Sequence, residues 1–225
     1  MFFSAMRILI WISVVCYFLQ SMYHPVFDLS YGLSYIGNDN FKLTQFLTYA
    51  FLHGDPFHLI INLFMLVVFG TKIEMLFGKK QFILLFFSGV LGGAIFQSIY
   101  NMVIIYNHFG TPFPLDTTND IIGNAFFVIE NGTYIKSVFS NLTIGASAGV
   151  FGCMIAFTML FPKDKFNFIF IPISMSARWF VVIYFILEVF QIIFVQNTQI
   201  AHMAHIGGVV FGALYAHFLK TKYNI

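Results

Sequence analysis

Six long apolar stretches constrain this chain more than any other feature, and they cover residues 6–22, 57–77, 81–101, 145–162, 178–195 and 200–219. Each is close to the roughly 20 residues that a helix needs to cross a bilayer. Charged residues make up only 9% of the 225 residues, against roughly a quarter in a soluble domain. The sequence therefore predicts an all-α membrane protein, a single bundle of six transmembrane helices over residues 1–225. A soluble enzyme, a disordered chain and a nucleic-acid-binding module are excluded, because a soluble fold could not bury so much apolar surface.

The basic residues give the expected orientation in the bilayer. One side of the predicted bundle holds both termini and the connections around residues 78–80 and 162–178. Nine basic residues fall on that side: Arg7, Lys72, Lys79, Lys80, Lys163, Lys165, Arg178, Lys220 and Lys222. The other side receives only Lys42 and Lys136. Because Lys and Arg are enriched in cytoplasmic segments, we expect both termini in the cytoplasm, and the lack of added domains favours a bacterial plasma (inner) membrane.

Two long loops are expected on the outer side, over residues 23–56 and 102–144. The first is rich in aromatic residues, and we expect it to be structured and partly embedded at the membrane interface. The second contains an apolar run over residues 121–129 that is too short to cross a bilayer. It also carries two weak glycosylation patterns, which begin at Asn131 and Asn141. No role is predicted for this second loop.

Polar residues inside the predicted spans gather at one depth, near the outer surface. His58 and Asn62 are four residues apart, so they share one face of the second span. Ser147 lies at the start of the fourth span and His205 lies early in the sixth. Polar groups inside a membrane are functional candidates by default. A serine, a histidine and an amide donor are the groups that nucleophilic acyl transfer needs.

Small residues surround two of these candidates. Ser147 sits in Gly145-Ala-Ser-Ala-Gly149 at a predicted helix start, where backbone N–H groups and the helix dipole favour developing negative charge. The sixth span carries a small-xxx-small face that we expect to pack on the fourth span, with Gly208 and Gly212 against Ala148 and Gly152. Such close packing would bring the imidazole of His205 within reach of the Ser147 hydroxyl.

Several motifs together resemble the rhomboid intramembrane serine proteases. They are His53-Gly-Asp-Pro-Phe-His58-Leu-Ile-Ile-Asn62, Gly145-Ala-Ser147, Ala204-His205-Ile-Gly-Gly208, and Gly70-Thr-Lys-Ile-Glu74 followed by Gly78. The matches occur in the family's order and on the expected spans. The resemblance covers nearly the whole chain, which is similar to the basic six-helix bacterial form.

The resemblance implies a role for each matching residue. Ser147 matches the nucleophile, and His205 matches the general base in a dyad without a carboxylate. His58 and Asn62 match side-chain donors of the oxyanion hole, which the backbone N–H of Ser147 joins. The implied activity is cleavage of peptide bonds in or next to transmembrane segments of single-span or polytopic membrane proteins. It implies small residues near the cut, a wet cavity open to the outer face, and no cofactor or metal.

The chain departs from the family pattern in two places. Ala148 stands where many members have glycine, and Thr44-Gln45 stands where an aromatic–arginine pair is often found. Alanine is still small, so tight packing at Ala148 is expected to survive. His53 and Glu74 match structural positions of the family rather than reacting groups.

Other polar residues in the spans keep alternative interpretations. His202 competes with His205 for the base role, but only His205 is followed by glycine at the third and seventh positions. His202 is therefore expected to be a polar cap or a supporting residue. Glu188 lies in the middle of the fifth span, where it is either protonated or faces a partner, and it could affect movement of that span. Gln97 and Ser98 would line a wet cavity or bond between helices.

Two other functional classes stay open at this point. One is a non-catalytic rhomboid-like protein that binds membrane proteins, although the intact Ser147 and His205 argue against it. The other is a haem or ion-handling protein that would use His58, His202, His205 and His217. His217 lies near the inner end of the sixth span, which weakens that reading. Metal hydrolysis is discarded, because the spacing from His53 to His58 does not fit a helical zinc pair.

Overall fold

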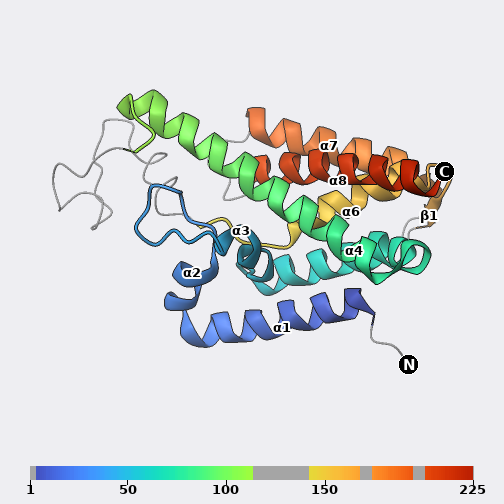
Figure 1. Ribbon diagram of the computed structural model, residues 1–225, viewed down its shortest axis with the longest axis horizontal. Helices are drawn as coiled ribbons and strands as arrows, with labels where there is room; N and C mark the ends of the chain where they lie inside the picture. The colour runs from blue at the N-terminus through green and yellow to red at the C-terminus, as the bar shows by residue number, and fades with distance from the viewer. Residues whose placement is uncertain (1–3, 114–141, 168–173, 195–200, 225) are drawn as a thin grey trace.

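The computed structural model describes residues 4–113, 142–167, 174–194 and 201–224, and these residues are mostly helical. The body of the described chain consists of α1 (Ala5–Tyr23), α4 (Pro56–Phe109), α6 (Ser147–Leu160), α7 (Ala177–Phe194) and α8 (His202–Tyr223). Their long axes follow a common direction in Figure 1. Each helix falls on an apolar stretch of the sequence, with α4 covering two of them. The coarse prediction of a helical membrane fold is therefore supported.

α4 consists of two antiparallel arms, because the chain reverses at Gly78 (Figure 1). Gly78 has φ 81°, a value that glycine adopts without steric cost. The second arm continues beyond the predicted end at residue 101 as far as Phe109, and Gly110 caps it with φ 70°. The reason for this extension is Ile105, which is fully buried in a small cluster with Tyr35 of the first loop.

The segment between α1 and α4 contains α2 (Val26–Tyr31), α3 (Gln45–Thr48) and the 3-10 turn η1 (Tyr49–Phe51). Gln45 is fully buried and ties this segment together. Its Nε2 donates to the carbonyls of Leu29 (3.1 Å) and Asn40 (2.9 Å), and its Oε1 accepts from the N–H of Ser34 (3.2 Å). One amide side chain therefore satisfies backbone groups from three parts of the segment.

A short β-ladder lies in the connection between α6 and α7. β1 (Lys165–Asn167) pairs antiparallel with β2 (Ser174–Ser176), with Phe166 opposite Met175. This ladder departs from the all-α prediction. It was missed because the prediction rested on apolar stretches of bilayer length, and these strands lie between two of them.

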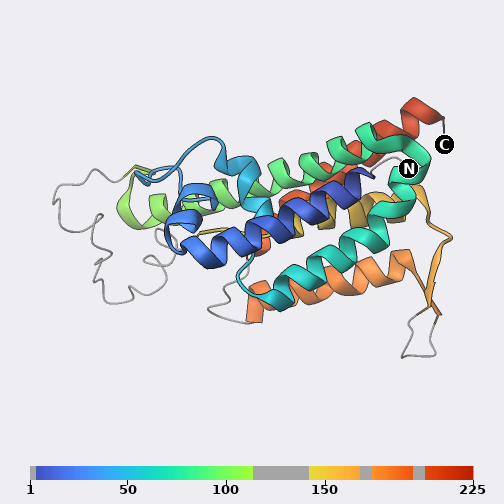
Figure 2. The same ribbon diagram turned by 90° about the horizontal axis from the view of Figure 1, so that it is seen from below.

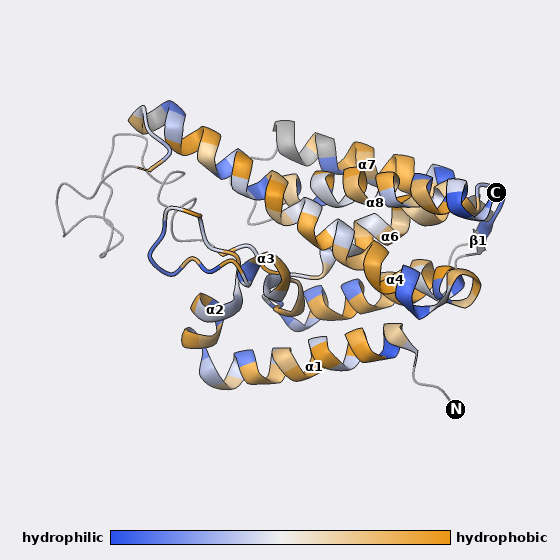
Figure 3. Cartoon of the chain, viewed as in Figure 1, coloured by the Kyte–Doolittle hydropathy of each residue, from blue (hydrophilic) through white to orange (hydrophobic). Residues whose placement is uncertain are grey.

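Much of the outer surface of the bundle is apolar. In Figure 3, hydrophobic residues run along the helices, while hydrophilic residues gather at helix ends and in the loops. Large apolar side chains such as Trp11, Phe57 and Trp179 point outward, with exposed fractions of 66%, 74% and 62%. By length and composition, two of the described helices could cross a membrane, α1 and residues 56–107 of α4. A surface of this kind suits contact with lipid rather than water.

α6 is the central helix of the described chain, and most of its residues are buried. It packs on the second arm of α4 and on α8 through glycine. A Cβ on Gly208 would lie 2.2 Å from the carbonyl oxygen of Ala148, and one on Gly212 would lie 2.4 Å from the Cα of Gly152. The predicted small-residue face between these two helices is therefore confirmed.

The helix ends fall into two groups (Figures 1 and 2). α1 starts and α8 ends at the same end of the bundle as the turn at Gly78. There the carboxylate of Glu74 caps the start of α1 by accepting from the hydroxyl of Ser4 (2.6 Å) and from two backbone N–H groups, of Ala5 (2.6 Å) and Met6 (3.1 Å). The starts of α4, α6 and α8 lie toward the opposite end, and they carry the polar residues singled out in the sequence.

Candidate active site

The hydroxyl of Ser147 and the imidazole of His205 are in direct contact. The distance from His205 Nε2 to Ser147 Oγ is 2.8 Å, although the two residues are 58 apart in the sequence. Ser147 is the first residue of α6 and is partly exposed, whereas His205 lies in the first turn of α8 and is buried. A neutral imidazole at this distance can accept the hydroxyl proton and activate the oxygen as a nucleophile.

Two contacts fix the His205 ring against α6. Phe151 stacks on it with a centroid distance of 4.4 Å and an interplanar angle of 14°. Phe151 follows Ser147 by one helical turn, so the same face of α6 supplies both the hydroxyl and the aromatic platform. Gly208 lies three residues after His205 on α8, and its backbone contacts Ala148 of α6. This contact sets the depth of the His205 ring relative to Ser147.

A carboxylate completes the arrangement on the other side of His205. Glu188 of α7 is 4% exposed, and its Oε1 lies 2.5 Å from His205 Nδ1 and 2.6 Å from His202 Nδ1. The resemblance implies a dyad without a carboxylate, and the structure adds an acidic side chain at the second nitrogen of the histidine. Glu188 stood out in the sequence because a charge inside a membrane span is energetically unfavourable. No spacing along the sequence could predict its contact with histidines of α8.

His58 lies beside the loop that leads into Ser147. A Cβ built on Gly145 would be 2.9 Å from His58 Cε1 and 3.0 Å from His58 Nε2, and 3.7 Å from Ser147 Oγ. His58 is placed by the first turn of α4, where the carboxylate of Asp55 accepts its backbone N–H at 2.8 Å. The imidazole therefore sits next to the nucleophile, at the end of the bundle where α6 begins.

Asn62 is buried one turn further along α4. Its Nδ2 donates to the carbonyl of His58 at 2.8 Å. An amide nitrogen has two N–H groups, so this bond leaves one for another acceptor. The backbone N–H of Ser147 is a further donor, because the first N–H groups of a helix have no partner within it.

The loop before Ser147 is held by backbone contacts. Gly145 has φ 126°, a conformation that other residues rarely adopt, and its N–H donates to the carbonyl of Tyr49 at 2.9 Å. The hydroxyl of Tyr49 donates to the carbonyl of Val90 on the second arm of α4 at 2.8 Å. The sequence motif around Ser147 therefore needs glycine at its first position for conformational reasons and for the space that His58 occupies.

His53 supports the same loop from the other side. Its Nε2 accepts the backbone N–H of Ala146 at 3.4 Å, and its own backbone N–H donates to Gln20 Oε1 at 3.0 Å. Burial, together with the nearby imidazole of His58, lowers the pKa of His53 to about 4. His53 is consequently neutral at physiological pH, and it acts as an acceptor for the residue directly before Ser147.

The remaining candidates fall outside this group. Gln97 donates from Nε2 to Asn101 Oδ1 at 2.9 Å, while Gln97 Oε1 and the hydroxyl of Ser98 are buried without a hydrogen-bond partner among the described residues. His217 lies near the end of α8, away from its first turn. The four histidines of the haem or ion-handling interpretation are therefore not gathered in one place.

Glu188, His202 and His205 could hold a metal ion by geometry alone, since one ligand atom from each lies within 4.8 Å of the others. Two imidazoles and a carboxylate are a donor set that zinc accepts. Their hydrogen bonds already provide each of these three groups with a partner. The arrangement thus needs no metal to account for it.

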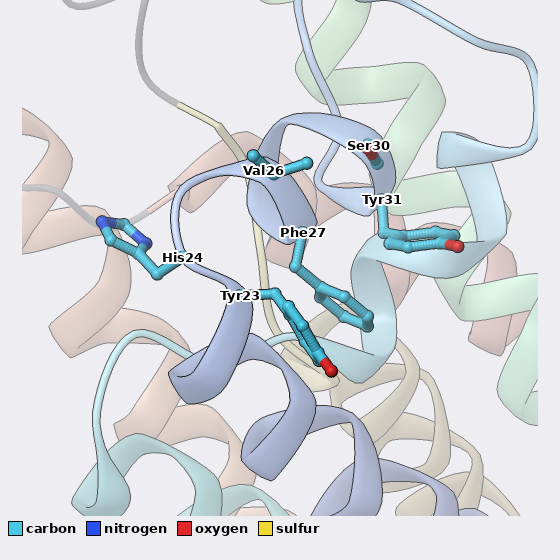
Figure 4. A pocket seen from close by; sticks show the side chains of 6 residues that line it. All are labelled: Tyr23, His24, Val26, Phe27, Ser30 and Tyr31. Atoms are coloured by element: carbon cyan, nitrogen blue, oxygen red, sulfur yellow. The ribbon is translucent and has the colours of Figure 1, made fainter.

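A separate pocket lies at the corner between α1 and α2, lined by Tyr23, His24, Val26, Phe27, Ser30 and Tyr31 (Figure 4). It contains none of the residues described above. Half of its lining residues are aromatic, and two of these are tyrosines, which are enriched where a membrane protein meets the headgroup region.

Comparison with known proteins shows the family. The Rhomboid domain family model matches residues 40–222. The chain is similar to RHOMBOID-like protein 12, mitochondrial, from Arabidopsis thaliana, with 27% identity over 195 residues, which are 84% of this chain and 51% of that protein. It is also similar to Rhomboid-like protein 16, chloroplastic, from Arabidopsis thaliana, with 34% identity over 55 residues, 24% of this chain and 17% of that protein. The chain thus spans about half the length of the first relative, and it belongs to the membrane-embedded rhomboid family.

Proposed function

We propose that this chain is an intramembrane serine endopeptidase that cleaves peptide bonds in or next to transmembrane segments of other membrane proteins. The observation that carries the proposal is the 2.8 Å contact between His205 Nε2 and Ser147 Oγ. A serine hydroxyl and an imidazole at this distance, with N–H donors beside them, form the arrangement that acyl transfer requires. Membership of the rhomboid family supports the same reaction.

The reaction follows from the groups present. Ser147 Oγ attacks the carbonyl carbon of the scissile peptide bond while His205 Nε2 takes the hydroxyl proton. His205 then returns the proton to the leaving amine, which breaks the C–N bond and leaves an ester on Ser147. A water molecule, deprotonated by His205, attacks this ester. The bond from the carbonyl carbon to Ser147 Oγ then breaks, the carboxylic acid product leaves, and His205 returns the proton to Ser147 Oγ.

Negative charge on the carbonyl oxygen needs donors during both attacks. The backbone N–H of Ser147, the imidazole of His58 and the second N–H of Asn62 are the groups that fill this role in the proposal. Removal of one such donor typically costs on the order of 10²-fold in rate or more. No step uses a cofactor or a metal.

The proposal includes a membrane arrangement. The two arms of α4 count as separate spans, so α1, α4, α6, α7 and α8 provide six transmembrane helices. In this proposal both termini are in the cytoplasm, because basic residues are concentrated at the end of the bundle near Gly78 and Lys and Arg are enriched in cytoplasmic segments. The cluster at the other end then opens to the outer face of a plasma membrane, where water can reach Ser147. Substrates are single-span or polytopic membrane proteins with small residues near the cut.

The test is cleavage of a single-span model protein in proteoliposomes, comparing wild type with Ser147→Ala and His205→Ala. Matched controls are Ser13→Ala, a buried serine of α1 that bonds to the carbonyl of Leu9, and His217→Ala near the end of α8. Cleavage that is lost in the first two variants and kept in the controls supports the proposal. Cleavage that persists in Ser147→Ala would show that Ser147 is not the nucleophile.

The alternative is a rhomboid-like protein that binds membrane proteins without cutting them. Labelling of the protein with a fluorophosphonate probe separates the two cases, because the probe reacts with an activated serine hydroxyl. An endopeptidase is labelled at Ser147, and the labelling is absent in Ser147→Ala. A folded wild type that neither cleaves nor reacts with the probe would favour the binding function.

A further inference from the structure

We propose that Glu188 is a positioning residue for the reaction, so that Ser147, His205 and Glu188 act as a triad; this inference rests on the endopeptidase function proposed above. The three groups lie in series. Glu188 Oε1 is 2.5 Å from His205 Nδ1, and His205 Nε2 is 2.8 Å from Ser147 Oγ. The carboxylate comes from α7, the base from α8 and the nucleophile from α6.

One oxygen of Glu188 is shared by two histidines. Both His202 Nδ1 and His205 Nδ1 approach the same atom, Glu188 Oε1. Two N–H donors on one oxygen stabilise negative charge on it, so they favour the ionised carboxylate over the neutral acid. In the arrangement that we propose, Glu188 is ionised and each imidazole carries its proton on Nδ1.

This state of Glu188 makes His205 competent as a base. With the proton on Nδ1, the Nε2 atom has a free lone pair directed at the hydroxyl of Ser147. When His205 takes the hydroxyl proton, the ring becomes positively charged in a buried site. A carboxylate at Nδ1 holds the ring in orientation and stabilises that charge, as the aspartate does in the serine protease triad.

His202 has a supporting role in this arrangement. It lies one turn before His205 on α8, and its Nδ1 contacts the carboxylate at 2.6 Å. A second N–H donor on the same oxygen favours the ionised form of Glu188 and restricts the rotation of its side chain. The sequence alone could not distinguish this supporting role of His202 from that of a simple polar cap. The role depends on contact with Glu188, which lies on another helix.

Because Glu188 lies on α7, the position of α7 affects the orientation of His205. Much of α7 is exposed, including Ile186, Leu187 and Phe190, whereas Glu188 is buried and contacts two histidines of α8. α7 lies beside α8 in Figure 1. Phe151 of α6 also contacts Tyr184 of α7, one turn before Glu188, with ring centroids 5.2 Å apart. The base is therefore fully oriented only while α7 stays packed against α6 and α8.

The experiment compares wild type with Glu188→Gln and Glu188→Asp in proteoliposomes, measuring kcat and KM for cleavage and the rate of fluorophosphonate labelling of Ser147. All assays contain a chelator, so that a metal bound to Glu188, His202 and His205 cannot contribute. We expect Glu188→Gln to lower kcat and the labelling rate by on the order of 10²-fold or more, with KM changed less than about threefold. Glu188→Asp keeps the charge and is expected to recover at least about tenfold of that loss.

The structural control is Glu74→Gln, the same substitution at the carboxylate that caps α1. This variant is expected to lower the thermal midpoint while its folded fraction keeps a wild-type kcat. The positioning role is rejected if Glu188→Gln cleaves at a near wild-type kcat, or if Glu188→Asp is no better than Glu188→Gln. A folded wild type that neither cleaves nor labels overturns the endopeptidase function itself, so the two failures are distinct.

Discussion

Gly208 of α8 lies directly against the backbone carbonyl of Ala148 in α6. A Cβ on Gly208 would be 2.2 Å from that oxygen and 2.9 Å from the carbonyl carbon. These atoms are backbone, so they cannot move aside without shifting a helix. Ala148 follows Ser147 and Gly208 lies three residues after His205. The contact therefore sets the separation of the two helices at the candidate nucleophile and base.

Gly208→Ala is consequently expected to be strongly destabilising and to abolish cleavage. Overpacking of a close contact typically costs 1–3 kcal/mol, and separating α6 from α8 would also draw His205 away from Ser147. The measurement is the thermal unfolding midpoint in detergent together with cleavage in proteoliposomes. Gly54→Ala is the matched control, because a Cβ there would meet only Ile144 Cδ1 at 3.9 Å. A stable and active Gly208→Ala protein would contradict the contact.

Gly145→Ala is expected to reduce cleavage more than stability. The substitution meets two obstacles, a φ of 126° that disfavours a side chain and the His58 ring at 2.9 Å. The backbone obstacle costs of order 1–3 kcal/mol, while the second displaces either His58 or the loop that carries Ser147. We expect kcat to fall by at least about tenfold, measured in proteoliposomes on the folded fraction.

Gly110→Ala separates these two effects. Gly110 also has a positive φ, of 70°, but a Cβ there meets nothing within 4 Å. This variant is expected to lose some stability and to keep its kcat. If both variants lost activity to the same extent, backbone strain rather than contact with His58 would be the cause.

The positions of the main helices and the members of the main polar cluster could be predicted from the sequence for physical reasons. Apolar length marks each helix, and the small-xxx-small spacing of Gly208 and Gly212 marks a close helix contact whatever its partner. Ser147 and His205 are near one another because their helices start at the same end of the bundle. These features depend on local pattern and on chain direction, and both can be read from one sequence.

The contacts of Glu188 and Gln45 could not be read in the same way. Each side chain bonds to groups brought close by tertiary packing, with no fixed spacing along the chain. Glu188 stood out as an ionisable residue inside a membrane span, where a charge is energetically unfavourable. Its partners on α8, however, depend on the rotation of α7 about its own axis. The extension of α4 to Phe109 was missed because the expected length was that of a bilayer, and the extra turns pack on Tyr35 instead.

Gln45→Ala is expected to loosen the segment between α1 and α4. It removes three hydrogen bonds and leaves the N–H of Ser34 and the carbonyls of Leu29 and Asn40 without this partner. Each buried group left unpaired costs about 1–3 kcal/mol, so we expect a lower thermal midpoint and faster proteolysis within residues 23–56. Gln45→Met fills a similar volume without the polar groups, and it should be equally destabilised. A normal midpoint for Gln45→Met would mean that packing rather than hydrogen bonding is what Gln45 provides.

Acidification is expected to destabilise the protein through His53. The folded pKa of His53 is about 4, whereas an unfolded histidine has a pKa of about 6.5. The unfolded state therefore binds the proton first, so this contribution to stability is complete above pH 6.5 and is lost as the pH falls toward 4. Between pH 7 and pH 5 the loss is about 2 kcal/mol.

His53→Gln tests that assignment, because glutamine does not titrate and its carbonyl can still accept the N–H of Ala146. We expect the thermal midpoint of the variant in detergent to fall less than that of wild type between pH 7 and pH 5. His217→Gln, at the far end of α8, is the control that should keep the wild-type dependence. If the thermal midpoint depended on pH equally in His53→Gln and wild type, another group would be the cause of the acid sensitivity. His53 accepts the N–H of the residue directly before Ser147, so protonation of His53 should also weaken the loop that holds the nucleophile. The rate of cleavage should therefore fall together with stability as the pH of a wild-type sample is lowered. The fall in the rate of cleavage should be smaller in His53→Gln.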